Sequence, residues 1–351
     1  MFRLEGGSAQ EIEKPISEIK DPKQELSIQQ KALISGMLQE VSNVTTQYEI
    51  QDGERFYEDI FQEGDFASLV QKFKKDPKDC LALGRNNLMA IMADKEMPLS
   101  RRQERVRRYV DAFLDLIIKL DRAAFPPAFA EVKRGVPEYI PDGLSDLGSD
   151  PETDPKLRNR EKIRVDKENI FAQSKELFYE IFSEDLGGIG SSKMKEQFAL
   201  KASQFVYNKM PYNYKKQDEL TRHETSFLLS DITDRELAVC RHHALYSQVL
   251  FQAMGLTTRL LKCDVSFSDG RSGGHAVNLF RNNGQWYLMD VTIPDQKDGK
   301  AVPFLRSISE EDVDVNKKNY TWTFRRGDGT TCEYKTRNNM HYYIKDNRQP
   351  L

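Results

Sequence analysis

A cysteine, a histidine and an aspartate occur in the order that a thiol acyl-transfer enzyme needs. Cys240 lies in the run Val-Cys-Arg-His-His-Ala-Leu, His275 follows a glycine pair, and Asp290 ends the run Trp-Tyr-Leu-Met-Asp. A thiol is a strong nucleophile as its thiolate, which a helix N-terminus and a neighbouring imidazolium both stabilise. The imidazole in turn needs a carboxylate that fixes its tautomer and orientation. These residues therefore predict nucleophilic catalysis by Cys240, with His275 and Asp290 as its partners.

The segment after Cys240 predicts the helix that positions the thiol. From Ala244 to Met254 the chain is rich in Leu, Val, Phe and Ala, contains no proline or glycine, and is followed by Gly255. This pattern is typical of a buried helix with glycine at its C-terminal end. Cys240 should then lie in or near the first turn, where unpaired backbone N–H groups favour a negative sulfur. The same N–H groups can hold a developing oxyanion.

Two predicted strands bring His275 and Asp290 together. Residues 275–280 and 285–290 alternate as strands do, and the Arg-Asn-Asn-Gly run between them is typical of a turn. A loop at the two asparagines would place His275 directly opposite Asp290. A loop at the Asn-Gly pair would place the two residues diagonally on the same face. Their Cβ atoms would be roughly 4.5–8 Å apart in either register, so we expect an imidazole–carboxylate hydrogen bond in both.

The segment from about Ala199 to Pro294 resembles the core of the transglutaminase-like superfamily, a branch of the papain-like cysteine enzymes. The family pattern is a Cys that opens a helix, a Gly-apolar-x-x-Arg step, a His that starts a strand, and a Trp-x-x-x-Asp strand. The matching positions are Cys240, Gly255 to Arg259, His275, and Trp286 to Asp290. The chain departs from the pattern at Ala276-Val277, where an aromatic often follows the His, and at Val291, where a proline often follows the Asp.

The resemblance implies an α+β fold in which the nucleophile helix packs on an antiparallel sheet. It implies Cys240 as nucleophile, His275 as general base and acid, and Asp290 as the residue that orients the imidazole. It also implies an oxyanion donor before the nucleophile, with Gln204, Tyr212 and Tyr214 as candidates alongside Tyr207, Asn208 and Asn213. The Cys-Arg-His-x-Ala-Leu run is also similar to a regulatory domain of plant Raf-like kinases, in which the fold is kept without proven catalysis.

A zinc site built from Cys240, His242, His243 and Cys263 is the other chemical interpretation. The sequence lacks a Cys-x-x-Cys or His-x-x-x-His pair, and adjacent helical histidines point about 100° apart. We therefore expect no metal and no cofactor. One of the two histidines should face solvent or the rim of the cleft, and Arg259 should pair with a carboxylate in the core.

Composition is typical of a soluble protein of a reducing compartment. The net charge of −3 gives no bias towards nucleic acid or an anionic membrane. No apolar run approaches the ~18 residues of a spanning helix, and the N-terminus lacks the apolar region of a secretory signal. The four cysteines, Cys80, Cys240, Cys263 and Cys332, have no disulfide-framework spacing. We expect a cytoplasmic protein, or one exported without a signal peptide, as bacterial effectors are.

The chain is expected to divide into four parts. Residues 1–21 form a flexible N-terminus, 22–125 an all-helical domain, 126–157 a linker rich in Pro, Gly, Asp and Ser, and 158–351 a transglutaminase-like catalytic domain. Further predicted elements are helices at 24–48, 54–74, 80–94, 100–124, 158–184 and 192–209, and a hairpin of residues 320–326 and 331–337 that extends the sheet.

The predicted function is thiol-dependent acyl transfer on a carboxamide or peptide bond of a protein or peptide substrate. A thioester on Cys240 would be resolved by water in a glutamine deamidase and by an amine in a transglutaminase. Two alternatives remain: a cysteine protease or peptidase on the same core, and a non-catalytic protein-binding module. In either case the helical domain is the expected partner-binding surface.

Overall fold

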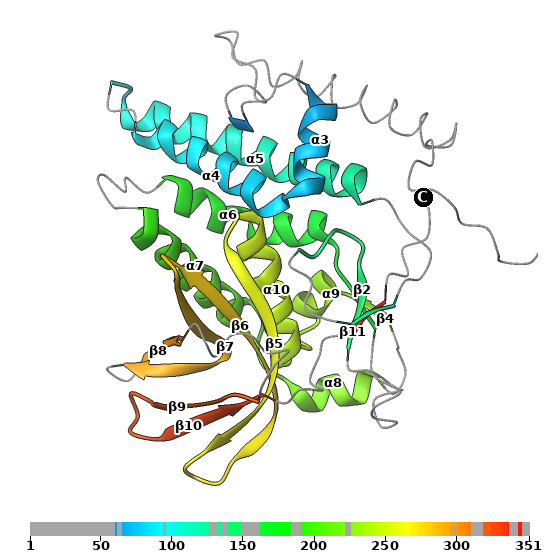
Figure 1. Ribbon diagram of the computed structural model, residues 1–351, viewed down its shortest axis with the longest axis vertical. Coiled ribbons are helices and arrows are strands. Elements are labelled where there is room, and N and C mark those ends of the chain that lie inside the picture. Colours follow the sequence, from blue (N-terminus) through cyan, green and yellow to red (C-terminus); the bar gives the residue numbers. More distant parts are fainter. Residues whose placement is uncertain are drawn as a thin grey trace, which may run out of the picture.

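A computed structural model shows an α+β protein in which helices pack on one face of a curled antiparallel sheet (Figure 1). The structure describes residues 60–61, 65–93, 96–125, 132–134, 139–148, 162–183, 191–221, 226–297, 300–309, 319–336 and 343–345. The expected flexible segment 1–21 and the helix expected at 24–48 lie outside these residues. Among the described helices, none combines the length and apolar character needed to cross a bilayer.

The helices follow the predicted apolar periodicity. In α5, the positions Val106, Val110, Phe113 and Ile117 recur at helical spacing and all are buried. The helix predicted to start at residue 158 begins later, because residues 162–164 form a strand instead. The helices are α3 (Phe66–Lys75), α4 (Pro77–Ala93), α5 (Leu99–Ala124), α6 (Lys167–Ser183), α7 (Ser191–Lys209), α8 (Tyr214–Thr221), α9 (Leu229–Asp234) and α10 (Cys240–Ala253).

The main sheet has the strand order β8-β7-β6-β5-β10-β9. Its strands are β5 (Thr257–Phe267), β6 (Ser272–Asn282), β7 (Gln285–Lys297), β8 (Lys300–Ile308), β9 (Thr321–Arg325) and β10 (Thr331–Lys335). The predicted C-terminal hairpin is confirmed as β9–β10, and it extends the sheet by pairing β10 with β5. A second, small sheet has the order β1-β11-β2-β3-β4, with strands Val132–Arg134, Tyr343–Lys345, Ser145–Gly148, Lys162–Arg164 and Ser226–Leu228.

The β6–β7 turn selects one of the two registers that the sequence leaves open. Asn282 pairs with Gln285, so Asn283 and Gly284 form the loop. Both loop residues have positive φ, 49° and 79°, as a two-residue type I′ turn requires. Asn and Gly tolerate this left-handed conformation at least cost, so the local sequence determines the turn and with it the register of the hairpin.

The sheet separates two hydrophobic cores. On β6 and β7, Ala276, Phe280, Met289 and Val291 belong to the core shared with the helices. The alternate residues of the same strands face a second core, which the curled sheet encloses with residues of β5, β8, β9 and β10. His275 and Asp290 have the strand parity of this second core.

The N-terminal helices share their core with α10. Buried residues of α3, α4 and α5 belong to the same cluster as those of α6, α7 and α10. The Arg85 guanidinium of α4 donates to the Met254 carbonyl at the end of α10 over 2.8 Å. A Cβ on Gly255, whose φ is +60°, would lie 2.3 Å from the Ala82 backbone nitrogen. The expected helical domain and catalytic domain are therefore not built on separate hydrophobic cores.

Part of the expected linker 126–157 packs against α5 and α6. Ile140 and Leu144 are buried, and the Tyr139 hydroxyl donates to Asp121 of α5 over 2.7 Å. Lys167 of α6 forms a buried ion pair with the same carboxylate at 2.7 Å and donates to the Tyr139 hydroxyl at 2.8 Å. Burying both charges is tolerable because each has a close partner. Through these contacts residues 139–148 pack against α5 and α6, so they are not a flexible linker.

Candidate active site

Cys240 opens α10, as its sequence context predicts. Val239 is the N-cap, and its carbonyl accepts from the backbone N–H groups of His242 at 2.9 Å and His243 at 3.2 Å. The Val239 N–H in turn donates to the imidazole Nδ1 of His242 over 3.1 Å. The thiol therefore lies at the positive end of a 14-residue helix, where the helix dipole favours a negative sulfur.

His275 and Asp290 form the predicted hydrogen bond. The β6–β7 register places Asp290 diagonally from His275 on the same face. The imidazole Nε2 lies 2.7 Å from the carboxylate Oδ2, and both side chains are almost completely buried. Because the carboxylate of an ionised Asp only accepts, Nε2 carries the proton, and Nδ1 is directed to Cys240.

Cys240 and His275 are in hydrogen-bond contact. Burial opposes ionisation of Cys240, but the hydrogen bond and charge of His275, together with the Ala276 N–H, lower the pKa of the thiol below its usual value. Burial alone would lower the pKa of His275, but the Asp290 carboxylate and the Cys240 thiol raise it to about 10. These shifts favour a thiolate–imidazolium pair at neutral pH.

The Asp290 carboxylate is held by more partners than the sequence predicts. The Tyr334 hydroxyl of β10 donates to Oδ2 over 2.8 Å. The backbone N–H groups of Thr292 and Ile293 donate to Oδ1 over 2.9 and 3.0 Å. Burial alone would raise the pKa of this carboxyl, but His275, the Ile293 N–H and the Tyr334 hydroxyl lower it overall. Asp290 is thus kept ionised in a fully buried position.

Tyr334 is the partner that sequence reasoning missed. It lies in the predicted C-terminal hairpin, 44 residues after Asp290, and carries no motif of its own. The one sequence feature that could have indicated it is the spacing from Cys332. The two residues are two positions apart on the same strand, so their side chains lie on the same, buried face. That spacing indicates an inward side chain, but its contact with Asp290 depends on the pairing of β10 with β5.

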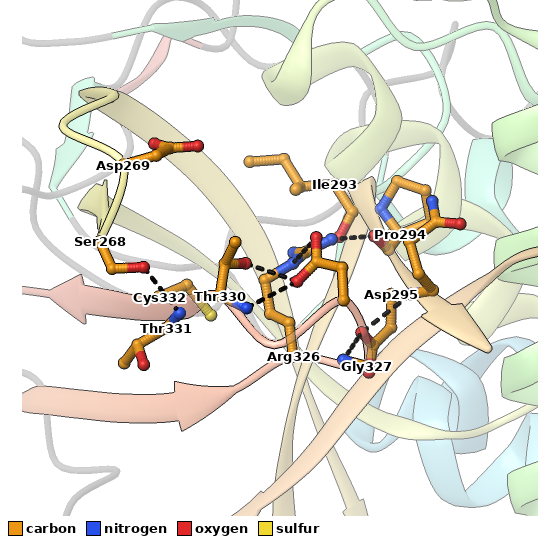
Figure 2. A network of polar contacts seen from close by, with 12 residues as sticks. Ser268, Asp269, Ile293, Pro294, Asp295, Arg326, Gly327, Thr330, Thr331 and Cys332 are labelled. Atoms are coloured by element: carbon orange, nitrogen blue, oxygen red, sulfur yellow. Dashed lines mark hydrogen bonds and ion pairs between the residues drawn. The ribbon is translucent and has the colours of Figure 1, made fainter. Parts of the chain in front are cut away.

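A β-bulge follows Asp290 in β7. The β7–β8 register shifts between Asp290 and Asp295, which frees the backbone N–H groups of residues 292 and 293 to turn towards the carboxylate. The β9–β10 turn holds this bulge: Figure 2 shows the Arg326 guanidinium at the carbonyl groups of Ile293 and Pro294. The Gly327 N–H also donates to the Asp295 carboxylate over 2.7 Å.

The expectation that one of the adjacent histidines faces solvent or the cleft rim is wrong. His242 and His243 are both 1% exposed, because α10 is surrounded by α7, the sheet and the chain before Cys240. Nε2 of His243 lies 2.6 Å from the Met210 carbonyl, and Nδ1 lies 3.0 Å from the Thr292 hydroxyl. Burial lowers the pKa of His243 to about 4. A neutral His243 therefore connects the segment before the nucleophile to the bulge after Asp290.

The structure places the three oxyanion candidates in different positions relative to Cys240. Residues 212–213 run beside Ala238, two positions before Cys240, through a parallel bridge and an Asn213-to-Ala238 hydrogen bond of 2.9 Å. Burial and the Cys240 charge raise the pKa of Tyr212, so this hydroxyl lies within electrostatic range of the thiol. Tyr214 is 61% exposed. The Gln204 amide donates to Asn208 over 2.9 Å on the surface of α7. Tyr212 is therefore the candidate that the fold brings beside Cys240.

Two of the other three cysteines, Cys263 and Cys332, lie in environments that suppress ionisation. Burial raises the pKa of Cys263 well above its usual value and also raises that of Cys332. Cys80 is 1% exposed in the helical core. Across the described ranges, no three His, Cys, Asp or Glu side chains are grouped as metal ligands would be. Arg259, which we expected to pair with a carboxylate, lies over the Trp286 ring at 5.1 Å from its centroid.

Comparison with known proteins leaves the chain without a family assignment. The sequence matches no protein-family model, and a search of curated proteins finds no similar sequence. The chemistry of the site therefore has to be argued from its own geometry.

Proposed function

We propose that this protein is a transglutaminase-like thiol enzyme that transfers the acyl group of a protein or peptide carboxamide to water or to an amine. The observation that carries the proposal is the contact chain from Cys240 at the start of α10, through His275, to the buried carboxylate of Asp290. Each contact has the polarity that its role needs: a thiol with a lowered pKa, a cationic imidazole and an ionised orienting carboxylate.

The reaction begins with attack of the Cys240 sulfur on the carboxamide carbon, which forms a C–S bond and places a negative charge on the oxygen. The Cys240 N–H at the first turn of α10 and the Tyr212 hydroxyl are the groups that we propose to stabilise that charge. His275 then donates its proton to the nitrogen, the C–N bond breaks, and ammonia leaves a thioester. Water or an amine attacks the thioester, gives its proton to His275, and releases Cys240.

The transglutaminase-like assignment is supported by the order and placement of the elements. The nucleophile helix packs on an antiparallel sheet whose neighbouring strands β6 and β7 carry His275 and Asp290 in that order. Cleavage of a peptide bond would use the same groups with an amine as leaving group. Release of ammonia, or the appearance of new N-termini, therefore separates the deamidase or transglutaminase activity from a protease activity.

Alkylation by iodoacetamide tests whether Cys240 is activated. At pH 6, where an unperturbed thiol is almost fully protonated, mass spectrometry should find Cys240 modified faster than Cys80, Cys263 or Cys332. The His275→Ala variant is the matched control and should lose this selectivity, because the imidazolium that stabilises the thiolate is gone. Equal, slow modification of all four thiols in the unaltered protein would leave a non-catalytic binding module as the better interpretation.

A further inference from the structure

His243 is a buried histidine whose two ring nitrogens each contact a different segment of the chain. It lies in the first turn of α10 and is 1% exposed. Nε2 lies 2.6 Å from the Met210 carbonyl oxygen, which can only accept, so Nε2 carries the proton. Burial lowers the pKa of His243 to about 4, so the ring is neutral near pH 7 and Nδ1 is an acceptor. The Thr292 hydroxyl, 3.0 Å from Nδ1, therefore donates to it.

One of these contacts leads to the Asp290 carboxylate. Thr292 uses its hydroxyl for His243 and its backbone N–H for Asp290 Oδ1, which lies 2.9 Å away. The β7–β8 register shifts between Asp290 and Asp295, so regular strand pairing does not fix residue 292. The hydrogen bond between the Thr292 hydroxyl and His243 therefore holds the peptide group that donates to Asp290.

The other contact leads to Tyr212. Met210, whose carbonyl accepts from His243, comes two residues before Tyr212. On the other side, the Asn213 N–H donates to the Ala238 carbonyl over 2.9 Å. The Tyr212 ring is 53% exposed and meets the His243 ring edge-on, with the centroids 6.4 Å apart. Because a half-exposed ring has few neighbours, its position depends on these two backbone anchors and on His243 itself.

We propose that His243 is a positioning residue that holds the Asp290 carboxylate and the Tyr212 hydroxyl at fixed positions relative to each other. The inference rests on the function proposed above, in which Asp290 orients the general base and Tyr212 stabilises the oxyanion. A neutral imidazole is a rigid ring with one donor and one acceptor, so it fixes both segments that it contacts. An apolar ring would fill the same space without fixing the direction of either segment.

Thr292→Val tests the connection to Asp290. The variant keeps the shape of the side chain and the backbone N–H but removes the hydroxyl that donates to His243. We expect kcat for ammonia release from glutamine peptides to fall about fivefold to tenfold with KM within about twofold, because the lost bond does not touch substrate. Alkylation of Cys240 by iodoacetamide at pH 6 should slow by at least about threefold. Thr292→Ser restores the hydroxyl and should recover both rates to within about twofold.

His243→Asn tests the connection to Tyr212. Asparagine keeps an acceptor near the Nδ1 position for Thr292 but is too short to reach the Met210 carbonyl. Tyr212→Phe should lower kcat by at least about tenfold in the unaltered protein. In the His243→Asn background its cost should be at least about fivefold smaller, because the hydroxyl is already displaced. Circular dichroism checks the fold of His243→Asn, and the Thr292 variants carry the test if it does not fold.

Two controls separate positioning from packing. Tyr246→Phe removes another hydroxyl from α10, one that bonds to Ile170 and Gln173 on the opposite side from the β7 bulge. It should lower the melting temperature and leave kcat within about twofold. In the Asp290→Ala background, Thr292→Val should lower kcat and the alkylation rate by less than about twofold, because the group through which it acts is absent.

The outcomes distinguish this inference from the proposed function. Slower alkylation in Thr292→Val, recovered in Thr292→Ser, supports the positioning role even if no ammonia is released, and that result contradicts the proposed reaction. If ammonia is released but Thr292→Val leaves both rates within twofold, the inference is overturned and the proposed function stands. The inference is also overturned by a loss that Tyr246→Phe reproduces or that persists in Asp290→Ala, and by an equal cost of Tyr212→Phe in both backgrounds.

Discussion

At the scale of single residues, the Asp290 carboxylate accepts four hydrogen bonds, and the His275 imidazole contacts both Asp290 and Cys240. Substitution of the two residues should therefore have different effects. Without His275 the imidazole that is proposed to carry the proton is lost. Without Asp290 the imidazole remains but loses its orientation and its stabilising charge.

Substitution of the three residues should give a graded series. Cys240→Ala should abolish ammonia release from glutamine peptides with an unchanged circular dichroism spectrum, and His275→Ala should be nearly as severe. Asp290→Ala should retain activity on the order of 10² above the His275 variant. Cys240→Ala/His275→Ala should be no worse than either single variant, because residues acting as one unit are non-additive. A silent Asp290→Ala would place the orienting carboxylate elsewhere.

The pH profile of kcat/KM should extend further than usual on both its acidic and its basic side. Because the pKa of Cys240 is lowered, kcat/KM should persist to pH values below those at which an ordinary thiol ionises. Because the pKa of His275 is raised to about 10, the imidazolium that protonates the leaving nitrogen is lost only as the pH rises through that value. A basic limb near pH 6.5, the usual histidine value, would contradict the thiolate–imidazolium pair.

Tyr334 should act as a positioning residue for Asp290. In Tyr334→Phe, Asp290 loses a hydroxyl donor, so the pKa of its carboxyl should rise. We expect kcat to fall on the order of tenfold with KM little changed, because the lost bond orients the imidazole and does not touch substrate. Tyr320→Phe is the matched control: it removes one hydroxyl from the same core, on a ring that stacks on Trp322.

At the scale of elements, the β9–β10 hairpin supports the site from two places. Its strand β10 supplies Tyr334, and its turn supplies Arg326 and Gly327 to the bulge that follows Asp290 (Figure 2). The hairpin is therefore part of the structural support of Asp290, although it lies far from Cys240 in the sequence.

Gly327→Ala tests that support. A Cβ at this position would lie 1.7 Å from the Gln296 carbonyl oxygen, so the turn must move away from the bulge. We expect the free energy of unfolding to fall by about 1–3 kcal/mol and kcat to fall with it, as thermal unfolding and ammonia release would measure. Gly273→Ala, whose added Cβ meets no atom within 4 Å, should change the stability by less than about 0.5 kcal/mol.

At the scale of the whole molecule, the nucleophile helix is anchored from both sides. The sheet packs on one face of α10, and α4 contacts its C-terminal end through Arg85 and the close approach of Ala82 to Gly255. A fragment that begins near residue 158 would lose α3, α4 and α5 and expose their side of the shared core. We expect such a fragment to aggregate, as light scattering would show; a soluble fragment with a reactive Cys240 would instead support the two-domain division.

Gly255→Ala measures how strongly the helical region holds the catalytic part. Alanine there faces both a positive φ and a contact of 2.3 Å with the Ala82 backbone. We expect the free energy of unfolding to fall by at least about 2 kcal/mol. Gly284→Ala has a similar φ of +79° without a neighbour within 4 Å, and should cost only about 1 kcal/mol. Equal losses in the two variants would show that the contact with α4 contributes nothing.

The sequence by itself determines the local features of the site. The apolar helix that ends at Gly255 places Cys240 in its first turn, and the Asn-Gly pair specifies a turn that puts His275 and Asp290 on one face of a hairpin. Both follow from periodicity and backbone sterics over fewer than about twenty residues, so no long-range contact is needed to predict them.

The tertiary structure alone decides what surrounds these residues. Three features of the site depend on which distant segments meet. They are the burial of His242 and His243, the hydrogen bond from Tyr334 to Asp290, and the packing of α4 against α10. Side-chain patterns specify which face of an element is buried, but not which partner buries it. For that reason the sequence predicts Cys240 as nucleophile with its base and its carboxylate, while the curled sheet determines how the three side chains are held.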